Sequence, residues 1–378
     1  MNVAFARPHL TGNEGEAVAR VIATGWVSQG PQVQAFEAAF AERVGAADAV
    51  AVSNCTTALH LALHASGVGP GDEVIVPSLS FIATANAVLH CGARPVFADV
   101  DPRTYNLDPR AAERAITPRT KAIMPVHQVG LPADMDRFLE LGERHGVAIV
   151  EDAACAIGAL YKDRPVGSLG PLTCFSLHPR KVITTGEGGM ITLQDADVAA
   201  RLRRLRAHGM SVSDLDRHAA DKVIIETYPE GGWNSRMTDM QAALGLCQMR
   251  MLDDILQRRR ALAERYTAAL ASMPHLEAPY DPDYAQRTWQ SYCVRVLPGS
   301  PVDRNELMSA LLADGIPTRR GVMAIHEEAA YAGDHGPLEH TEAAARDTVM
   351  LPLFADLTFE QQDYVLDRLA DHTAARAA

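Results

Sequence analysis

The stretch CFSLHPRKVITTGEGGM, residues 174–190, surrounds a single lysine with hydroxyl groups, small residues and glycines. Ser176 lies five residues before Lys181, and a glycine-rich turn follows the lysine. A lysine in a partly desolvated site holds its proton less tightly and becomes a nucleophile for carbonyl carbons. A solvated loop lysine is the commoner case when such a residue stands alone, and the stretch lacks the G-x-x-x-x-G-K-[ST] pattern of a P-loop. The role of Lys181 therefore depends on what the rest of the chain places beside it.

The first half of the chain alternates short apolar segments with helical ones. This alternation predicts βαβ units and a mostly parallel sheet with helices on both faces. After it, one long helix is predicted from Thr238 to about Met273, and the pattern then changes to that of a smaller α+β unit. We therefore predict a large domain over residues 1–250 and a small C-terminal domain over residues 251–378. The predicted strands are 49–53, 73–77, 95–100, 121–126, 147–152 and 292–296, and the later helices lie near 303–313 and 358–372.

Two helix starts carry the capping-box pattern, in which a threonine precedes a glutamate or glutamine by three residues. These pairs are Thr11 with Glu14 and Thr358 with Gln361. Such a pair predicts reciprocal hydrogen bonds between the two side chains and the two backbone N–H groups.

Polar residues follow three of the predicted strands, where open α/β sheets bind ligands. Residues 54–57, NCTT, open a helix, and the free N–H groups of a helix start bind phosphate well; an ordinary N-cap is the alternative. Asp152 ends a buried strand, where a carboxylate needs a cationic or hydrogen-bonding partner; a structural salt bridge is the alternative. With Lys181, these residues describe a site for pyridoxal phosphate (PLP), which needs its phosphate anchored, its ring nitrogen kept protonated and its aldehyde held by an amine.

Five motifs in order along nearly the whole chain resemble the DegT/DnrJ/StrS family of PLP-dependent sugar aminotransferases, which have the type I fold. They are SNCTTALHLAL (53–63), PSLSFIATANAV (77–88), EDAACAIGA (151–159), SLHPRKVITTGEGG (176–189) and GGWNSRMTDMQAALG (231–245). The resemblance implies that Lys181 forms the Schiff base with PLP and shuttles the proton, and that Asp152 pairs with the pyridine nitrogen. It implies further cofactor contacts for Thr56, Thr57 and Ser176 at the phosphate, for Phe81 against the ring, and for Asn234, which reaches the phosphate of the partner subunit. The family shares its sites across a homodimer, so the resemblance implies a homodimer here.

The chain departs from the family pattern at a few positions. Cys155 stands where many members have a glutamine that contacts the 3′-oxygen of PLP, and cysteine is a weaker hydrogen-bonding group. Trp233 and Ser235 replace the commoner tyrosines of the G-Y-N-Y-R-M motif. Some relatives carry histidine at the lysine position and are dehydratases, a variant that Lys181 excludes.

Two further segments are candidates for substrate binding. TGWVSQGP (24–31), with Trp26 and Ser28, resembles the family's N-terminal substrate loop, although a turn between two helices would have the same composition. Arg319, Arg320 and His326 lie close in sequence and could hold a nucleoside diphosphate or a carboxylate. A solvated surface patch is the alternative for these three residues.

Composition limits the partners. The net charge of −12 argues against nucleic acid and against an anionic membrane surface. No apolar run is long enough to span a bilayer, the N-terminus lacks the pattern of a signal peptide, and the six cysteines are scattered. We therefore expect a reduced cytoplasmic protein with no metal site.

The predicted function is transfer of an amino group to a keto-sugar that is linked to a nucleoside diphosphate, with L-glutamate as the donor by family analogy. Amination of a keto-cyclitol or another secondary-metabolite ketone is an alternative, because acceptor choice lies in loops. A non-catalytic PLP-binding protein on the same fold is a second alternative, against which the intact Lys181, Asp152 and Ser176 argue.

Overall fold

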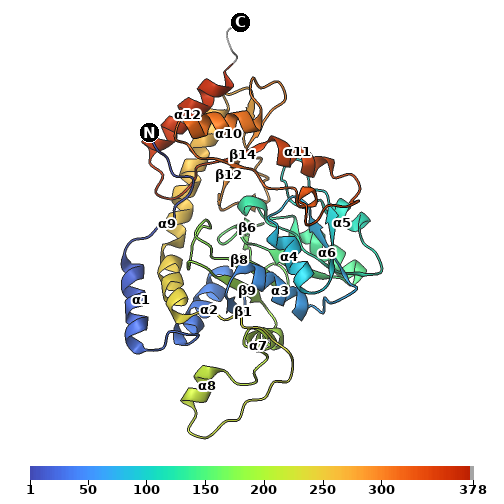
Figure 1. Cartoon of the computed structure of the whole chain (residues 1–378), viewed down its shortest axis with the longest axis vertical. Helices are drawn as coiled ribbons and strands as arrows, with labels where there is room; N and C mark the ends of the chain where they lie inside the picture. Colours follow the sequence, from blue (N-terminus) through green and yellow to red (C-terminus); the bar gives the residue numbers. More distant parts are fainter. Residues whose placement is uncertain (375–378) are drawn as a thin grey trace.

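The computed structural model describes residues 1–374, and its centre is a seven-stranded sheet with the strand order β1-β9-β8-β5-β4-β2-β3 (Figure 1). Neighbouring strands from β3 to β8 are parallel, whereas β9 runs antiparallel to both β8 and β1. The prediction of a mostly parallel sheet is confirmed, with β9 as the exception. The strands are β1 (Asp48–Val52), β2 (Glu73–Pro77), β3 (Arg94–Ala98), β4 (Thr120–Ile123), β5 (Ala148–Asp152), β8 (Leu172–Ser176) and β9 (Gly189–Leu193).

The reversed direction of β9 follows from its connection. Residues 177–188, which include Lys181, join β8 to β9 without a helix. A parallel return needs a crossover, usually through a helix, whereas a chain that turns back at the same edge can only pair antiparallel. The lysine stretch is therefore an excursion beyond one edge of the sheet.

Two hydrophobic cores cover the two faces of the sheet. Ala49 and Ala51 of β1 belong to one core, with Phe36 and Phe40 of α2, whereas Val50 and Val52 belong to the other core, with helix α3. This division follows the two-residue period of a strand. The flanking helices are α2 (Pro31–Val44), α3 (Cys55–Ala65), α4 (Ala83–His90), α5 (Pro109–Arg114), α6 (Met135–His145) and α7 (Ala196–Leu205).

Helix α9 (Asp239–Leu270) is one continuous helix that lies beside α1 and α2 in Figure 1, and it confirms the predicted long helix. Thr238 caps its start in a capping box with Gln241. Leu252 and Ile255 pack in the first core of the sheet, whereas Leu262 and Tyr266 pack in a third core. One helix thus joins two separately packed parts.

The third core covers a four-stranded antiparallel sheet in the order β10-β12-β14-β13. The predicted strand at 292–296 and both predicted C-terminal helices are confirmed. Val3 also packs in this core, and its N–H group bonds the Gly315 carbonyl oxygen at 3.1 Å. The domain boundary at residue 250 stays a prediction. The elements are β10 (Leu276–Glu277), β12 (Tyr292–Val296), β13 (Arg319–Arg320), β14 (Thr348–Leu351), α10 (Arg304–Ala313), α11 (Glu339–Asp347) and α12 (Phe359–Thr373).

The two predicted capping boxes have different outcomes. Thr358 and Gln361 form both reciprocal bonds at the start of α12. At the start of α1 (Asn13–Thr24), Glu14 accepts from the Thr11 N–H group at 3.1 Å, but Gly12 in a left-handed conformation occupies the N-cap position. Only half of the first box forms, because the helix begins one residue later than the pattern places it.

The remaining elements are short. One of them, α8 (Asp214–Ala219), lies in the α8 excursion, the segment of residues 206–234 between α7 and α9 that projects from the body in Figure 1. The other short elements are β6 (Leu160–Tyr161), β7 (Arg164–Pro165), β11 (Ala285–Gln286) and the 3-10 turns η1 (Gln128–Gly130) and η2 (Ile325–Glu327).

No helix within residues 1–374 is both long and apolar enough to cross a membrane.

Candidate active site

The three polar strand ends meet at one edge of the central sheet. Ser176, at the end of β8, pairs with Gly189, at the start of β9, and Gly189 also pairs with Val52, at the end of β1. Asp152, at the end of β5, pairs with Cys174 of β8. The sheet register therefore brings the ends of β1, β5 and β8 together with the loop that carries Lys181.

The start of α3 forms a cradle against β9. Asn54 is the N-cap residue, and its Oδ1 accepts a hydrogen bond from the Thr57 N–H group at 2.9 Å. A Cβ atom on Gly189 would lie 2.4 Å from the Asn54 carbonyl oxygen, so only glycine lets the strand approach this helix start so closely. The first N–H groups of a helix have no acceptor within it and bind anions. With the partly buried Thr56 and Thr57 and the buried Ser176 beside it, the cradle fits a phosphate group.

Asp152 is only 5 % exposed. Its Oδ2 accepts a hydrogen bond from Thr84 Oγ1 at 2.8 Å, and its Oδ1 accepts one from the Ala154 N–H group at 3.1 Å. Burial raises the pKa of Asp152, and these hydrogen bonds together with the Lys181 charge act in the opposite direction. A buried carboxylate with so few partners fits a cationic group such as a protonated ring nitrogen.

Lys181 lies in the same site, and its Nζ donates a hydrogen bond to Cys155 Sγ at 3.2 Å. Burial acts to lower the pKa of Lys181, but the adjacent Cys155, with smaller contributions from Cys55 and Asp152, raises it. The next two residues, Val182 and Ile183, are buried in the core and anchor the loop. The backbone of the lysine is therefore held by its buried neighbours while its amine reaches Cys155.

The hydroxyl groups that follow Lys181 in the sequence hold the loop together. Thr184 Oγ1 donates to the Leu177 carbonyl oxygen, and Thr185 Oγ1 donates to that of Glu187, both at 2.8 Å. These bonds satisfy backbone carbonyls that the loop cannot pair with a neighbouring strand. Their structural role explains why hydroxyl residues crowd the lysine.

Phe81 and Asn234 are both exposed. Phe81 follows β2 and leads into α4, with 63 % of its surface accessible, which leaves an aromatic face free beside the site edge. Asn234 belongs to the segment that returns from the α8 excursion. The carbonyl oxygen of the next residue, Ser235, accepts a hydrogen bond from the Ser53 N–H group at 2.9 Å, which ties this segment to the end of β1.

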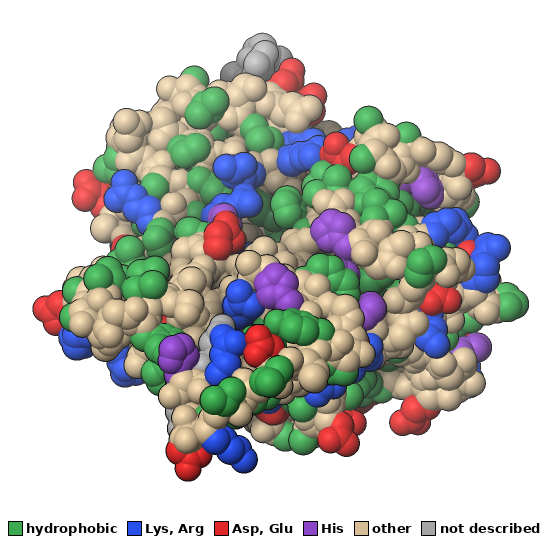
Figure 2. Space-filling view, turned by 60° about the horizontal axis from the view of Figure 1, so that its bottom comes forward, with side chains coloured by type: hydrophobic (Ala, Val, Ile, Leu, Met, Phe, Trp, Pro, Cys, Tyr) green, Lys and Arg blue, Asp and Glu red, His purple; other side chains and the backbone are tan. Residues whose placement is uncertain are grey.

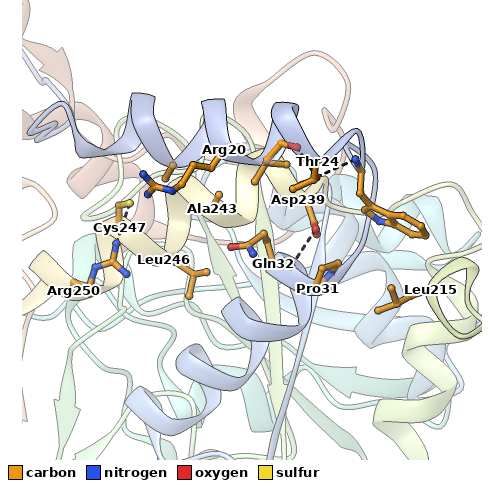
Figure 3. A pocket seen from close by; sticks show the side chains of 13 residues that line it. Arg20, Thr24, Pro31, Gln32, Leu215, Asp239, Ala243, Leu246, Cys247 and Arg250 are labelled. Carbon is orange, nitrogen blue, oxygen red and sulfur yellow. Dashed lines mark hydrogen bonds between the residues drawn. The ribbon is translucent and has the colours of Figure 1, made fainter. Parts of the chain in front are cut away.

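Trp26 and Ser28 lie between α1 and α2. Trp26 Nε1 donates to the Gln29 carbonyl oxygen at 2.9 Å, and the Ser28 carbonyl oxygen accepts from the Asp239 N–H group. Trp26 lines a cavity of about 420 Å³ between α1, α2 and α9 (Figure 3). Arg20, Cys247 and Arg250 lie at one end of this cavity in the same view. None of the predicted cofactor residues is among the described residues that line it.

The three predicted residues of the C-terminal part make separate contacts. Arg320 forms an ion pair with Glu328 at 2.9 Å, and the Arg319 guanidinium lies 5.4 Å from the centre of the Phe5 ring. His326 instead reaches the end of β2, where its Nδ1 lies 2.7 Å from Ser78 Oγ. The segment around His326 thus joins the C-terminal part to the site edge.

Several residues beside the site carried no signal in the sequence. Thr84 bonds Asp152, as described above. Thr288 Oγ1 donates to the Cys155 carbonyl oxygen at 2.8 Å, and Gln290 Nε2 donates to the Arg180 carbonyl oxygen at 2.7 Å. The latter two lie more than a hundred residues from their acceptors, so only the tertiary structure reveals them.

His127 and Glu151 form a buried pair behind the site. His127 Nδ1 accepts from the Ala133 N–H group at 2.9 Å, so its Nε2 carries the proton that is donated to Glu151 Oε2, also at 2.9 Å. Adjacent strand residues point to opposite faces, so Glu151 points away from Asp152.

Within residues 1–374, no group of three or more histidine, cysteine, aspartate or glutamate side chains is arranged to hold a metal ion.

Comparison with known proteins identifies the family. The model of the DegT/DnrJ/EryC1/StrS aminotransferase family matches residues 8–370. The chain is 43% identical over 370 residues to the GDP-perosamine synthase of Caulobacter vibrioides, with 97% of each chain covered. It is 40% identical over 373 residues to the spore coat polysaccharide biosynthesis protein SpsC of Bacillus subtilis, with 97% of this chain and 96% of SpsC covered.

Solved structures show the same fold. The aminotransferase TlmJ of Streptoalloteichus hindustanus superposes with a TM-score of 0.90 at 35% identity, covering 98% of this chain and 99% of TlmJ. DesV of S. venezuelae superposes with a TM-score of 0.88 at 37% identity, covering 97% of this chain and 95% of DesV. These matches confirm the predicted type I fold, and the chain belongs to the DegT/DnrJ/EryC1/StrS aminotransferase family.

Proposed function

We propose that this aminotransferase moves an amino group from L-glutamate to a keto-sugar linked to a nucleoside diphosphate, with PLP as its cofactor. The observation that carries the proposal is the meeting of Lys181, Asp152 and the α3 cradle at one edge of the sheet. The name of the Caulobacter relative, a GDP-perosamine synthase, supports a nucleotide-linked sugar as the acceptor. The PLP form of Spr1654 from Streptococcus pneumoniae, with a TM-score of 0.91 at 28% identity, supports the cofactor.

The described residues fit PLP at each of its groups. Thr56, Thr57 and Ser176 would hold the phosphate at the start of α3, where N–H groups and hydroxyls converge. Asp152 would pair with the ring nitrogen, and Phe81 would cover the ring. Cys155, beside Lys181, would lie near the 3′-oxygen. PLP, when bound, supplies an aldehyde and an electron-accepting ring for exchange of the amino group.

The side chains of this protein would contribute charge, orientation and proton transfer. Asp152 is buried, so its negative charge acts with little screening by solvent. Lys181 Nζ, in its neutral form, would accept a proton from the donor carbon and return it on the acceptor side. The anchored residues Val182 and Ile183 hold that amine in place, which lowers the entropic cost of the transfer.

Substrate binding would involve the segments that reach the site edge from outside it. His326 lies at the end of β2, and Arg319 and Arg320 precede it on β13. Guanidinium groups suit the oxygens of a diphosphate. Trp26 and Ser28 would contribute from the loop between α1 and α2.

We also propose that the protein acts in the cytoplasm as a homodimer in which Asn234 completes the partner subunit's phosphate site. The excursion that ends at Asn234 exposes three large apolar side chains, namely Val223 at 91%, Ile225 at 83% and Tyr228 at 57%. Figure 2 shows hydrophobic side chains among charged ones on the face that this excursion occupies. Exposed apolar residues on a projecting segment favour burial against another chain. Light scattering should give twice the mass of one chain, and a monomer that turns over at the full rate would refute the shared site.

The first test is the absorbance spectrum of the purified protein with PLP, before and after L-glutamate is added. We expect a visible band of protein-bound PLP that bleaches when the donor is added. A panel of keto-sugar nucleotides and keto-cyclitols should then restore the band only with a sugar nucleotide. A band that no amino donor changes would contradict the aminotransferase function, and restoration by a keto-cyclitol alone would contradict the proposed acceptor.

A further inference from the structure

A line of three buried polar side chains ends at the Asp152 carboxylate. Thr84 Oγ1 lies 2.8 Å from Asp152 Oδ2, and Ser80 Oγ lies 2.7 Å from Thr84 Oγ1. Thr84 is 1 % exposed and Ser80 is 2 % exposed. Buried hydroxyl groups at these distances are fully desolvated, so their hydrogen bonds are worth more than those on the surface.

The direction of these hydrogen bonds follows from their chemistry. An ionised carboxylate can only accept, so the single proton of Thr84 is donated to Asp152. The Thr84 oxygen then accepts, and Ser80 supplies the second proton. The Ser80 N–H group in turn donates to the Met323 carbonyl oxygen at 3.1 Å, which fixes the Ser80 backbone against the C-terminal part. The chain of donors therefore points toward Asp152.

The fold explains how Thr84 reaches this carboxylate. Thr84 lies in the first turn of α4, directly beyond the end of β2, and Asp152 ends β5. In the sheet, β4 separates β2 from β5. β4 ends at Ile123, and the chain that follows it bridges to Asp152 through Val126. A helix that starts at the site edge can make this contact, whereas a side chain on β2 itself cannot.

We infer that Thr84, supported by Ser80, is a positioning residue that orients the Asp152 carboxylate toward the ring nitrogen of the cofactor. The inference rests on the proposed function. Thr84 takes one lone pair of Oδ2 and the Ala154 N–H group takes one of Oδ1, so the carboxylate cannot rotate freely. Hydrogen bonds to an ion are about twice as strong as those between neutral groups.

The ionisation of Asp152 supports the same role. Burial raises the pKa of Asp152, and the hydrogen bond from Thr84 is the first of the contributions that lower it. The other titratable groups near this carboxylate are Lys181, His127, Cys55 and Cys174. Loss of the Thr84 hydroxyl should therefore leave Asp152 protonated at a higher pH, and a protonated carboxyl cannot stabilise a protonated ring nitrogen.

The experiment measures the dissociation constant of PLP for the apo-protein, by titration followed through absorbance, across a range of pH. Thr84→Val keeps the shape of the side chain and removes the hydroxyl, whereas Thr84→Ser keeps the hydroxyl. We expect Thr84→Val to weaken PLP binding about tenfold, which corresponds to about 1.4 kcal/mol, and to shift the acidic limb of the binding curve to higher pH. Thr84→Ser should restore most of the affinity, and Ser80→Ala should have a smaller effect in the same direction.

A double-mutant cycle with Asp152→Asn separates a positioning role from a general structural one. If Thr84 acts through Asp152, Thr84→Val should cause no further loss in the Asp152→Asn background. Thr173→Val is the matched control, because Thr173 Oγ1 donates to the neighbouring carboxylate of Glu151 at 2.7 Å, away from the site. This control should lower the stability of the protein but leave PLP affinity unchanged.

Different results would refute the proposed function and the positioning role of Thr84. A wild-type protein that does not bind PLP would refute the proposed function itself. Wild-type binding with an unchanged affinity in Thr84→Val would refute the positioning role alone. If Thr84→Val lowered the affinity equally with and without the Asp152→Asn substitution, that role would also be refuted, since the threonine would then act without the carboxylate.

Discussion

Gly189 lies against Asn54 so closely that any side chain at position 189 would collide with the backbone at the start of α3. A Cβ atom there would come within 2.4 Å of the Asn54 carbonyl oxygen and 2.9 Å of the Cys55 nitrogen. Backbone atoms cannot move aside as a flexible side chain can. This single approach holds the helix start, which we assign to the phosphate, beside Ser176 and the lysine loop.

Gly189→Ala should therefore damage both the fold and the phosphate site. Overpacking of this kind typically costs about 1 to 3 kcal/mol of stability, and PLP affinity should fall because α3 must shift. Urea denaturation and PLP titration measure the two effects. Gly69→Ala is the control, because nothing lies within 4 Å of a Cβ atom there. If Gly189→Ala matched this control in both measurements, the close approach would have no energetic importance.

Lys181→Ala should abolish amino transfer while the fold is retained. The loop is anchored by Val182, Ile183 and the bonds of Thr184 and Thr185, none of which involves the lysine amine. We expect turnover to fall at least about 10³-fold, the scale of a lost proton-transfer group. Circular dichroism should be unchanged. Lys181→Arg keeps the charge but offers no comparable nucleophile, so it should be equally inactive; full activity in either variant would contradict the assignment of Lys181.

Glu151→Gln should destabilise the protein. The Glu151 carboxylate accepts hydrogen bonds from His127 Nε2, the Gly170 N–H group and Thr173 Oγ1, and is fully buried. An amide has one acceptor oxygen and would direct N–H donors at groups that also donate. Removal of one partner from such a buried cluster costs about 2 to 4 kcal/mol. Glu143→Gln, at an exposed position, is the control. Equal urea midpoints for the two variants would show that the hydrogen bonds of Glu151 contribute little to the stability of the protein.

His60 should make the stability of the protein depend on pH between about 6.5 and 4. Burial, with the nearby His90 and His64, lowers the pKa of His60 to about 4. Its ring packs 4.7 Å from Trp233, the residue before Asn234. Below pH 6.5 the His60 side chain binds a proton in the unfolded chain but stays neutral in the folded protein until the pH nears 4. The free energy of unfolding therefore falls as the pH decreases and is fully recovered at neutral pH.

His60→Gln should remove this part of the pH dependence. Urea denaturation at several pH values between about 7 and 4 should show a shallower loss of stability in the variant than in the wild type, by about 2 kcal/mol over the range. The control is His340→Gln, since His340 is exposed and the hydrogen bond that it donates to Asp99 comes from its backbone N–H group. Parallel curves for the wild type and His60→Gln would show that His60 does not titrate as inferred.

The sequence by itself determined the elements and the family. Strands β1 to β5 and β12, the long helix from Thr238 and both C-terminal helices follow from the local pattern of apolar residues, whereas β8, β9 and β14 were not predicted from it. Asp152 and the NCTT segment were identified because each stands at the end of a predicted strand, and Lys181 because hydroxyl groups, small residues and glycines surround it in the sequence. These inferences need only the neighbours of a residue along the chain.

Only the tertiary structure decided which distant residues meet at the site. The antiparallel direction of β9, the approach of Gly189 to Asn54 and the contact of His326 with Ser78 all join segments far apart in sequence. The hydrogen bond from Thr84 to Asp152 spans 68 positions. Periodicity carries no information about such pairs, because they depend on strand order and on where each helix starts relative to the sheet edge. The sequence therefore did not reveal the residues that hold the site in place, such as Gly189 and Thr84, because their contacts exist only in the tertiary structure.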